Sequence, residues 1–146
     1  MAILRLTISN QLAELRRMGF ALAEFLEDEG ISRSTAHRVK LVVEELVVNV
    51  IQHAFDDGAP HAILLDIRTD ENGVAIVVED DGKAFDPTVA PSPPLKELLE
   101  TGKSGGLGVA IIKKVTRDLK YERVDDRNRV RAYVENSPRP GAGRHK

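Results

Sequence analysis

Apolar and polar side chains alternate at the start of the chain and then change to a helical spacing. Alternation over residues 2–8 predicts a strand with one face on a core. The next apolar positions recur every three or four residues and predict an amphipathic helix that ends near Gly30. Ser9 and Asn10 are suited to cap this helix. Its expected apolar positions are Leu12, Leu15, Phe20, Ala23 and Leu26.

A second apolar run predicts a longer and more deeply buried helix. Ser32 or Ser34 provides its cap, and the run continues to about Phe55. Turn-forming residues over 56–60 end it. Because its side chains are apolar in nearly every direction, most of this helix is expected to be buried.

The middle of the chain predicts a β-hairpin followed by a long loop. Strands are expected near 62–68 and 74–79, and the segment 70–73 that joins them ends in Asn-Gly, a strong hairpin signal. Residues 83–104 contain four prolines at positions 87, 91, 93 and 94 and are expected to be mostly loop, with one helical turn near 95–99.

The last third predicts one helix and two further strands. Residues 105–119 form a loop and then a helix, and strands over 120–124 and 129–134 flank Asp125-Asp126. Helices and strands are grouped along the chain rather than strictly alternating. This grouping favours a two-layer α+β sandwich over a doubly wound parallel sheet.

Composition limits the classes of protein that are possible. The chain has 146 residues, of which 42% are hydrophobic and 30% charged, with a formal net charge of −2 and no cysteine. These values are ordinary for one globular domain and give no general attraction to nucleic acid or membrane. No secretion signal or membrane-length apolar run is present, so a cytoplasmic protein is expected. The domain is expected over 1–136, with a disordered basic tail over 137–146.

Three polar groups stand out against this apolar background, and the first lies on the second helix. Glu45 and Asn49 are about 40° apart around a helix axis and about 6 Å apart along it, and His53 continues the stripe. An unpaired carboxylate and amide in such a helix would cost several kcal/mol. A magnesium nucleotide would satisfy them, with Asn49 as a metal ligand and Glu45 acting on an attacking hydroxyl. His53 would hold phosphate or pair with a carboxylate. The alternative is a structural pair in which an arginine neutralises Glu45.

The second polar group ends the hairpin. Period two puts Asp80 on the strand face of Val74, Ile76 and Val78. A carboxylate at that rim can accept the N6 amine of adenine. Gly82 would allow close approach of the backbone, and Phe85 would pack on the base. The alternative is a simple acidic turn.

The third group is rich in glycine. Gly105, Gly106, Leu107 and Gly108 open the expected third helix, where backbone N–H groups can converge on phosphate, and Lys103 can reach the same anion. The segment matches neither a P-loop nor the dinucleotide fingerprint. The alternative is a flexible linker before a tight helix start.

In this order, the three groups resemble the GHKL ATPases, which include gyrase, a family of heat-shock chaperones, histidine kinases and mismatch-repair ATPases. The resemblance covers about residues 3–135. Within that group, Val78-Glu-Asp-Asp-Gly-Lys-Ala-Phe-Asp-Pro87 and Gly105-Gly-Leu-Gly-Val-Ala-Ile-Ile-Lys-Lys114 are similar to the anti-sigma-factor serine kinases of bacteria. The resemblance implies a Bergerat sandwich, with helices on one face of a mixed, largely antiparallel sheet.

The resemblance also implies roles for individual residues. Glu45 would be the general base, Asn49 the Mg²⁺ ligand and Asp80 the adenine contact, while Gly82 and the glycines at 106 and 108 would shape the ATP pocket. Proteins of this kind bind a sigma factor and phosphorylate a serine or threonine of a STAS-domain antagonist, and they form homodimers.

Two positions depart from the family pattern. Ala84 stands where a second glycine is expected, and no late-strand threonine is present, since that strand offers Arg131 and Ala132 instead. These departures keep two alternatives open. One is a non-catalytic module that binds nucleotide and sequesters a sigma factor or regulator. The other is an isolated catalytic domain that phosphorylates histidine in a separate protein.

Overall fold

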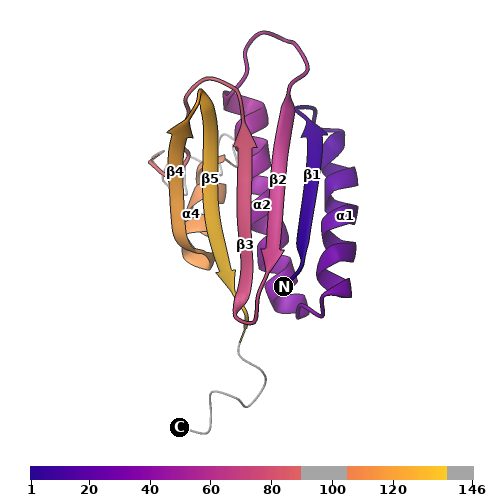
Figure 1. The fold of residues 1–146 in the computed structure, drawn as a ribbon. Coiled ribbons are helices and arrows are strands. Elements are labelled where there is room, and N and C mark those ends of the chain that lie inside the picture. Colours follow the sequence, from indigo (N-terminus) through magenta and orange to yellow (C-terminus); the bar gives the residue numbers. More distant parts are fainter. Residues whose placement is uncertain (90–104, 138–146) are drawn as a thin grey trace, which may run out of the picture.

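The computed structural model describes residues 1–89 and 105–137. Its elements in chain order are β1 (Ile3–Ser9), α1 (Glu14–Asp28), α2 (Arg33–His53), β2 (Ala62–Thr69), β3 (Gly73–Asp80), α4 (Gly105–Val115), β4 (Arg117–Val124) and β5 (Arg127–Glu135). The five strands form one sheet in the order β1-β2-β3-β5-β4, and every neighbouring pair is antiparallel. The helices lie together on one face of this sheet (Figure 1). The predicted two-layer α+β sandwich is therefore confirmed, and its described strands form a wholly antiparallel sheet rather than a mixed one.

Helix α2 forms the centre of the core, as the sequence predicts. Ser32 is its N-cap, and the Ser32 hydroxyl accepts a hydrogen bond from the Thr35 backbone N–H at 3.2 Å. The helix packs on β3 and β5 and contacts α1 and α4. Its buried side chains are Thr35, Val39, Val42, Val43, Leu46, Val47, Asn49 and Val50.

The predicted cap of the first helix is wrong. Helix α1 begins at Glu14 after Ala13, which makes no side-chain capping bond. The Asn10 side chain instead binds the loop before β2, where it accepts a hydrogen bond from the His61 backbone N–H at 2.9 Å. The Ser9 N–H donates to the Glu14 carboxylate at 3.0 Å. Residues 9 and 10 thus join β1 to its neighbours rather than starting α1.

The buried stripe of α1 also differs from the predicted one. Met18, Leu22 and Leu26 are buried, at a spacing of four residues. Phe20 lies about 200° around the axis from Met18 and is 65% exposed. Leu12 precedes the helix and is 62% exposed. The spacing of apolar residues predicted this helix correctly, but it assigned Phe20 and Leu12 to the buried face, where Met18 and Leu22 lie instead.

Two tight turns organise the strands. In the β2–β3 hairpin, the Asp70 carboxylate accepts hydrogen bonds from the backbone N–H groups of Asn72 and Gly73. In the β4–β5 hairpin, Asp125 and Asp126 have φ values of 51° and 60°, the left-handed conformation that a two-residue hairpin turn needs. The β2–β3 hairpin was predicted, whereas β4 and β5 were predicted only as two strands on either side of Asp125-Asp126.

The helix predicted over 105–119 ends earlier than expected. Helix α4 stops at Val115, and β4 begins at Arg117. Asp118 has a φ of 54°, and the β4–β5 register is irregular between Arg117 and Lys120. This irregularity hides the strand from a simple period-two reading. The turn predicted near 95–99 lies outside the described residues.

The last described residue contacts the start of α2. Ser137, assigned to the predicted tail, binds the first turn of α2, where its N–H donates to the Thr35 hydroxyl at 3.0 Å. The rest of that tail, 138–146, lies outside the described residues. Of the helices described, none is both long and apolar enough to span a bilayer.

Candidate functional site

The end of α2 and the end of β3 meet around a narrow cavity. Asn49 and Asp80 both line it, together with Phe85 and Asn128 and the apolar side chains of Leu46, Val50, Ala54, Pro87 and Val130. Asp80 therefore faces the helix layer, as the strand alternation predicts. The cavity measures about 10 Å³, room for about one water molecule.

Asn49 is the least satisfied polar side chain of this region. It is 3% exposed, and its amide nitrogen finds no hydrogen-bond acceptor among the described residues. An unsatisfied buried amide costs about 1–3 kcal/mol. Rotation about its terminal bond can turn either the amide nitrogen or the amide oxygen toward a ligand. The chemistry of this side chain fits a polar ligand that enters the cleft.

Glu45 lies one helical turn before Asn49 and is half-buried. Burial raises the pKa of its carboxyl group, and the negative charge of Glu44 adds to this effect. No ion pair to Glu45 occurs within residues 1–89 and 105–137. The alternative of a neutralising arginine therefore finds no support in this part of the chain. A carboxylate with a raised pKa is suited to accept a proton.

His53 and Phe85 form an aromatic contact at the mouth of the cavity. Their rings stack with centroids 4.6 Å apart and an interplanar angle of 21°. His53 is exposed at the last turn of α2, whereas Phe85 lines the cavity. Within the described part of the chain, His53 thus contacts the Phe85 ring.

Asp80 is 2% exposed, and it is held by two hydrogen bonds to one oxygen. Its Oδ1 accepts from the Gly82 N–H at 2.8 Å and from the Asn128 side-chain amide at 2.9 Å. Burial raises the pKa of the Asp80 carboxyl group, and these two hydrogen bonds partly oppose the rise. Both bonds engage Oδ1, so within the described part of the chain Oδ2 is left for a donor on a ligand.

Gly82 is required by its packing against the end of α2. A Cβ atom there would collide with the carbonyl oxygen of Ala54 and would lie 2.6 Å from the Ala54 Cβ. The next residue, Lys83, donates its backbone N–H to the same carbonyl at 2.9 Å. Ala84, which replaces an expected glycine, has no positive φ. The loop thus tolerates alanine at 84 but not at 82.

Asn128 is the site residue that the sequence reasoning missed. Its amide nitrogen donates to Asp80 and to the Lys83 carbonyl at 2.8 Å. Its carbonyl oxygen accepts from the Tyr121 hydroxyl at 2.6 Å, from the Arg123 guanidinium at 3.1 Å and from the Phe85 N–H at 3.3 Å. Asn128 thus joins the carboxylate, the loop above the cavity and the β4–β5 hairpin.

The strand register gives the reason that Asn128 was missed. Asn128 pairs with Asp80 across β3 and β5, whereas Ala132 pairs with Ile76 and Arg131 with Val77. The polar residue of β5 that faces Asp80 is therefore Asn128, which precedes Arg131 and Ala132 along the strand. Pairing the two strands from Asp80 would have found Asn128.

The glycine-rich segment lies where a helix start was predicted. Helix α4 begins at Gly105, so Gly106, Leu107 and Gly108 belong to its first turn. Helix α4 packs against α2. The first turn of a helix has free N–H groups that favour an anion. Lys103 lies outside the described residues.

A metal ion at this site would need ligands from outside the protein. Among the residues that the structure describes, no group of three or more His, Cys, Asp or Glu side chains has metal-binding geometry. Asn49 offers one neutral oxygen. Mg²⁺ commonly takes one or two protein ligands and completes its shell with phosphate and water, so the residues present fit Mg²⁺ bound together with a nucleotide.

This chain is similar in sequence to known proteins. A model of the histidine kinase-like ATPase domain matches residues 8–134. The serine/threonine-protein kinase BtrW of Bordetella bronchiseptica is 35% identical over 98 residues, which cover 67% of this chain and 69% of BtrW. The serine-protein kinase RsbW of Oceanobacillus iheyensis is 28% identical over 123 residues, covering 81% and 68% of the two chains.

A solved structure has the same fold. The crystal structure of the RsbU and RsbW domains of Rv1364c from Mycobacterium tuberculosis superimposes with a TM-score of 0.67 at 15% sequence identity. The match covers 94% of this chain and 34% of the solved one.

Proposed function

Because this chain belongs to the histidine kinase-like ATPase domain family, which implies ATP binding, we propose that it is a Mg²⁺-ATP-dependent protein serine/threonine kinase. The observation that carries this proposal is the buried amide nitrogen of Asn49, which has no hydrogen-bond partner among the described residues and lies in a cleft that also contains Asp80. Glu45, one helical turn away, is half-buried. Two relatives named as serine kinases support the same reaction class.

The adenine base is assigned to the inner end of the cleft. Asp80 Oδ2 accepts the N6 amine, and the apolar walls from Leu46, Val50 and Val130 cover the faces of the base. The present cavity is too small for a purine. Phe85 and Pro87 must therefore move outward when nucleotide enters, so we expect the His53–Phe85 stack to change on binding.

The phosphates are assigned to the side of the cleft formed by α2 and α4. Asn49 provides the protein oxygen for Mg²⁺. The N–H groups of the α4 first turn, at Gly105 to Gly108, and the ammonium of Lys103 hold phosphate oxygens. When bound, Mg²⁺-ATP supplies the γ-phosphoryl group and neutralises charge on it.

Glu45 is assigned the role of general base. Its carboxylate takes the proton of the partner's serine or threonine hydroxyl as that oxygen forms its bond to the γ-phosphorus and the bond to ADP breaks. Burial raises the pKa of Glu45 and brings it closer to neutrality, which favours proton transfer.

The partners are assigned by the sequence resemblance. We propose that the chain acts as an anti-sigma factor in the cytoplasm, that it phosphorylates a STAS-domain antagonist, and that it binds a sigma factor, with a homodimer as the active form. Phosphorylation of the antagonist would keep it from displacing the sigma factor.

Phosphate transfer from radiolabelled ATP to a candidate STAS-domain protein tests the proposal. Glu45→Gln should bind ATP normally and transfer phosphate about 10²–10⁴ times more slowly. The control is Glu24→Gln, because Glu24 is an exposed carboxylate on α1, and it should stay close to the wild-type rate. Wild-type transfer by Glu45→Gln would remove Glu45 as the base, and absence of ATP binding by the wild type would remove the whole assignment.

The narrow cavity supports a second candidate function, a module that binds a partner without transferring phosphate. Partner binding that ignores ATP and tolerates Asn49→Ala would favour this candidate. An acid-labile phosphoprotein product would instead indicate phosphohistidine, and with it an isolated histidine-phosphorylating domain.

A further inference from the structure

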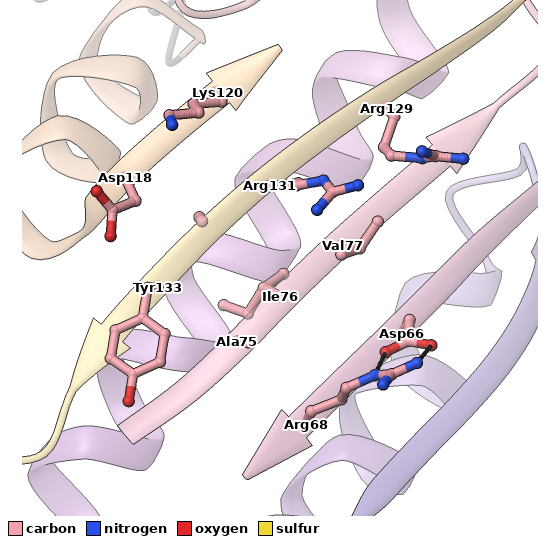
Figure 2. Close-up of a pocket in the computed structure, with 11 residues that line it drawn as sticks. Asp66, Arg68, Ala75, Ile76, Val77, Asp118, Lys120, Arg129, Arg131 and Tyr133 are labelled. Atoms are coloured by element: carbon pink, nitrogen blue, oxygen red, sulfur yellow. Dashed lines mark hydrogen bonds and ion pairs between the residues drawn. The ribbon is translucent and has the colours of Figure 1, made fainter. Parts of the chain in front are cut away.

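The sheet face opposite the helices contains a broad trough that the nucleotide cleft does not use. Its volume is about 840 Å³. Ala75 and Val77 of β3 form its floor, while Arg68 of β2 stands on one side and Arg131 of β5 on the other (Figure 2). Lys120 of β4 extends the second side. A short, partly apolar floor between basic walls is the main feature of this face.

Cations outnumber carboxylates over most of this face. Each of three carboxylates is shared by two arginines: Arg5 and Arg68 bind Asp66, Arg127 and Arg129 bind Glu79, and Arg129 and Arg131 bind Glu122. Lys120 adds a further positive charge, while Arg117 at the far end is balanced by Asp118 and Glu135. The whole chain has a net charge of −2, so this face differs in sign from the rest of the molecule.

We propose that this trough docks an acidic amphipathic segment of a partner protein. The apolar side chains of the segment would lie on Ala75 and Val77, and its carboxylates would pair with Arg68, Lys120 and Arg131. Charge complementarity of this kind mainly sets specificity and the rate of association.

The basic side chains of the trough are available for a partner. The side chains of Arg68 and Arg131 are 44% and 55% exposed. A guanidinium has five N–H donors, and Arg131 uses one of them on Glu122 in the described contacts. Ion pairs at this exposure contribute about 0–1 kcal/mol each, so an incoming carboxylate can add to them or replace them at little expense.

Other occupants fit this face less well. A phosphate backbone has no apolar side chains to place on the floor of Ala75 and Val77. A second copy of the chain would bring the same positive face against itself. An acidic protein segment with apolar side chains matches both the walls and the floor.

Strand alternation keeps this surface separate from the cleft. Ala75, Val77 and Glu79 lie on one side of β3, while Ile76, Val78 and Asp80 point to the helix layer. A partner on the trough therefore leaves the cleft open, and the inference does not depend on the proposed kinase activity.

Peptide titration of the ¹⁵N-labelled full chain, followed by NMR, tests the docking proposal. The probe is a synthetic amphipathic helical peptide made of Glu and Leu, compared with the same peptide carrying Gln for Glu. The Glu peptide should bind at low salt, weaken as salt rises, and shift amide signals of β3, β4 and β5. Lys120→Glu and Arg131→Glu should each weaken it about tenfold, or about 1.4 kcal/mol.

Matched variants separate a local from a general charge effect. Arg33→Glu makes the same charge change at the exposed start of α2 and should bind the Glu peptide like wild type. Glu122→Gln removes a competing carboxylate and should bind it more tightly. Thermal melts of each variant confirm that it is folded.

Four results would overturn the proposal. They are equal binding of the Glu and Gln peptides, tighter binding of a DNA duplex than of the Glu peptide, shifts confined to the helices, and unchanged affinity in both Lys120→Glu and Arg131→Glu. A dimer in sedimentation that Arg131→Glu dissociates would assign the face to a second copy instead.

Discussion

The two faces of the sheet hold charge in opposite ways. On the outer face, arginines and carboxylates are exposed or half-exposed and form a shared ionic network. On the helix face, Asn49, Asp80 and Asn128 are almost fully buried, and the Asn49 amide nitrogen has no hydrogen-bond partner in the described part of the chain. The outer network adds little to stability because its ion pairs are exposed to solvent, and we propose that it docks an acidic segment. The Asn49 amide nitrogen lacks a hydrogen-bond acceptor among the described residues, and a ligand could supply one.

Adjacent residues on β3 show the contrast most directly. Burial acts to raise the pKa of Glu79, but hydrogen bonds from Arg127 and Arg129 outweigh it and lower the pKa. Burial raises the pKa of Asp80, and the hydrogen bonds from Asn128 and Gly82 do not compensate. The folded protein therefore stabilises the charged form of Glu79 and destabilises the charged form of its neighbour Asp80.

The largest expected effect comes from another adjacent pair, Asn128 and Arg129 on β5. Asn128→Ala should lower the free energy of unfolding by about 3 kcal/mol, because it leaves several buried donors and acceptors unpaired. Arg129→Ala should lower it by about 1 kcal/mol or less, since its partners Glu79 and Glu122 keep another arginine. Urea unfolding of both variants measures the difference, and equal losses would contradict the contrast between the two faces.

The next effect concerns nucleotide affinity. Asp80→Asn replaces one of the two carboxylate oxygens with an NH₂ group, so the side chain can no longer accept hydrogen bonds both from its protein partners and from adenine. ATP should then bind about 100-fold more weakly, which corresponds to about 2–3 kcal/mol for a hydrogen bond to a charged group. Isothermal titration with Mg²⁺-ATP measures it. Glu79→Gln, one residue away on the outer face, is the control and should bind ATP like wild type.

A pair of glycine variants tests the packing of the cleft. Gly82→Ala should destabilise the protein by about 1–3 kcal/mol, because its Cβ meets the Ala54 carbonyl. Gly19→Ala, in the middle of α1 with nothing within 4 Å of the added Cβ, should stabilise the protein by about 1 kcal/mol. Thermal melts compare the two, and a neutral Gly82→Ala would show that the loop end of the cleft can shift.

The smallest effect is a pH dependence of opposite sign at the two β3 carboxylates. Since the Glu79 pKa is lowered, its contribution is full above its ordinary value of 4.5 and is lost as pH falls through the folded-state pKa. Glu79→Gln should thus be less stable than wild type at neutral pH, with the gap closing in acid.

For Asp80 the sign reverses. Its raised pKa favours the protonated folded form, so its contribution is full below 3.8 and is lost as pH rises through the folded-state pKa. Without nucleotide, Asp80→Asn should be more stable than wild type at neutral pH, and the gain should vanish below 3.8. Unfolding curves of Glu79→Gln, Asp80→Asn and wild type at several pH values measure both stability differences. If both variants were less stable, or both more stable, than wild type at neutral pH, the opposite pKa shifts would be refuted.

Local patterns predicted much of the fold because they act over a few residues. The alternation in β3 placed Asp80 toward the helices, and the continuous apolar run of α2 predicted its burial correctly. The Asn72-Gly73 turn predicted the β2–β3 hairpin. Each of these signals is contained within one element or one turn, so no partner strand had to be known.

Other features depend on pairing between distant segments. Asn128 belongs to the site only because β5 pairs with β3 in one register. Asn10 is used by the loop at His61 rather than by α1, since β1 ends beside that loop. Phe20 was assigned to the core because apolar count does not reveal which side of α1 meets the sheet. Pairing and packing decide these positions.

The strand register also decides where foreign sequence can be attached. Ile3 and Glu135 lie at one end of the sheet, opposite Arg68 and Gly73, while Asp80 lies at the other end beside Ile63. An affinity handle, a fluorescent reporter or a surface tether joined before Ile3 or after Glu135 would start at the end of the sheet away from Asp80. A tether or fusion on the Ile3 side or the Glu135 side is therefore expected to leave the cleft near Asp80 accessible.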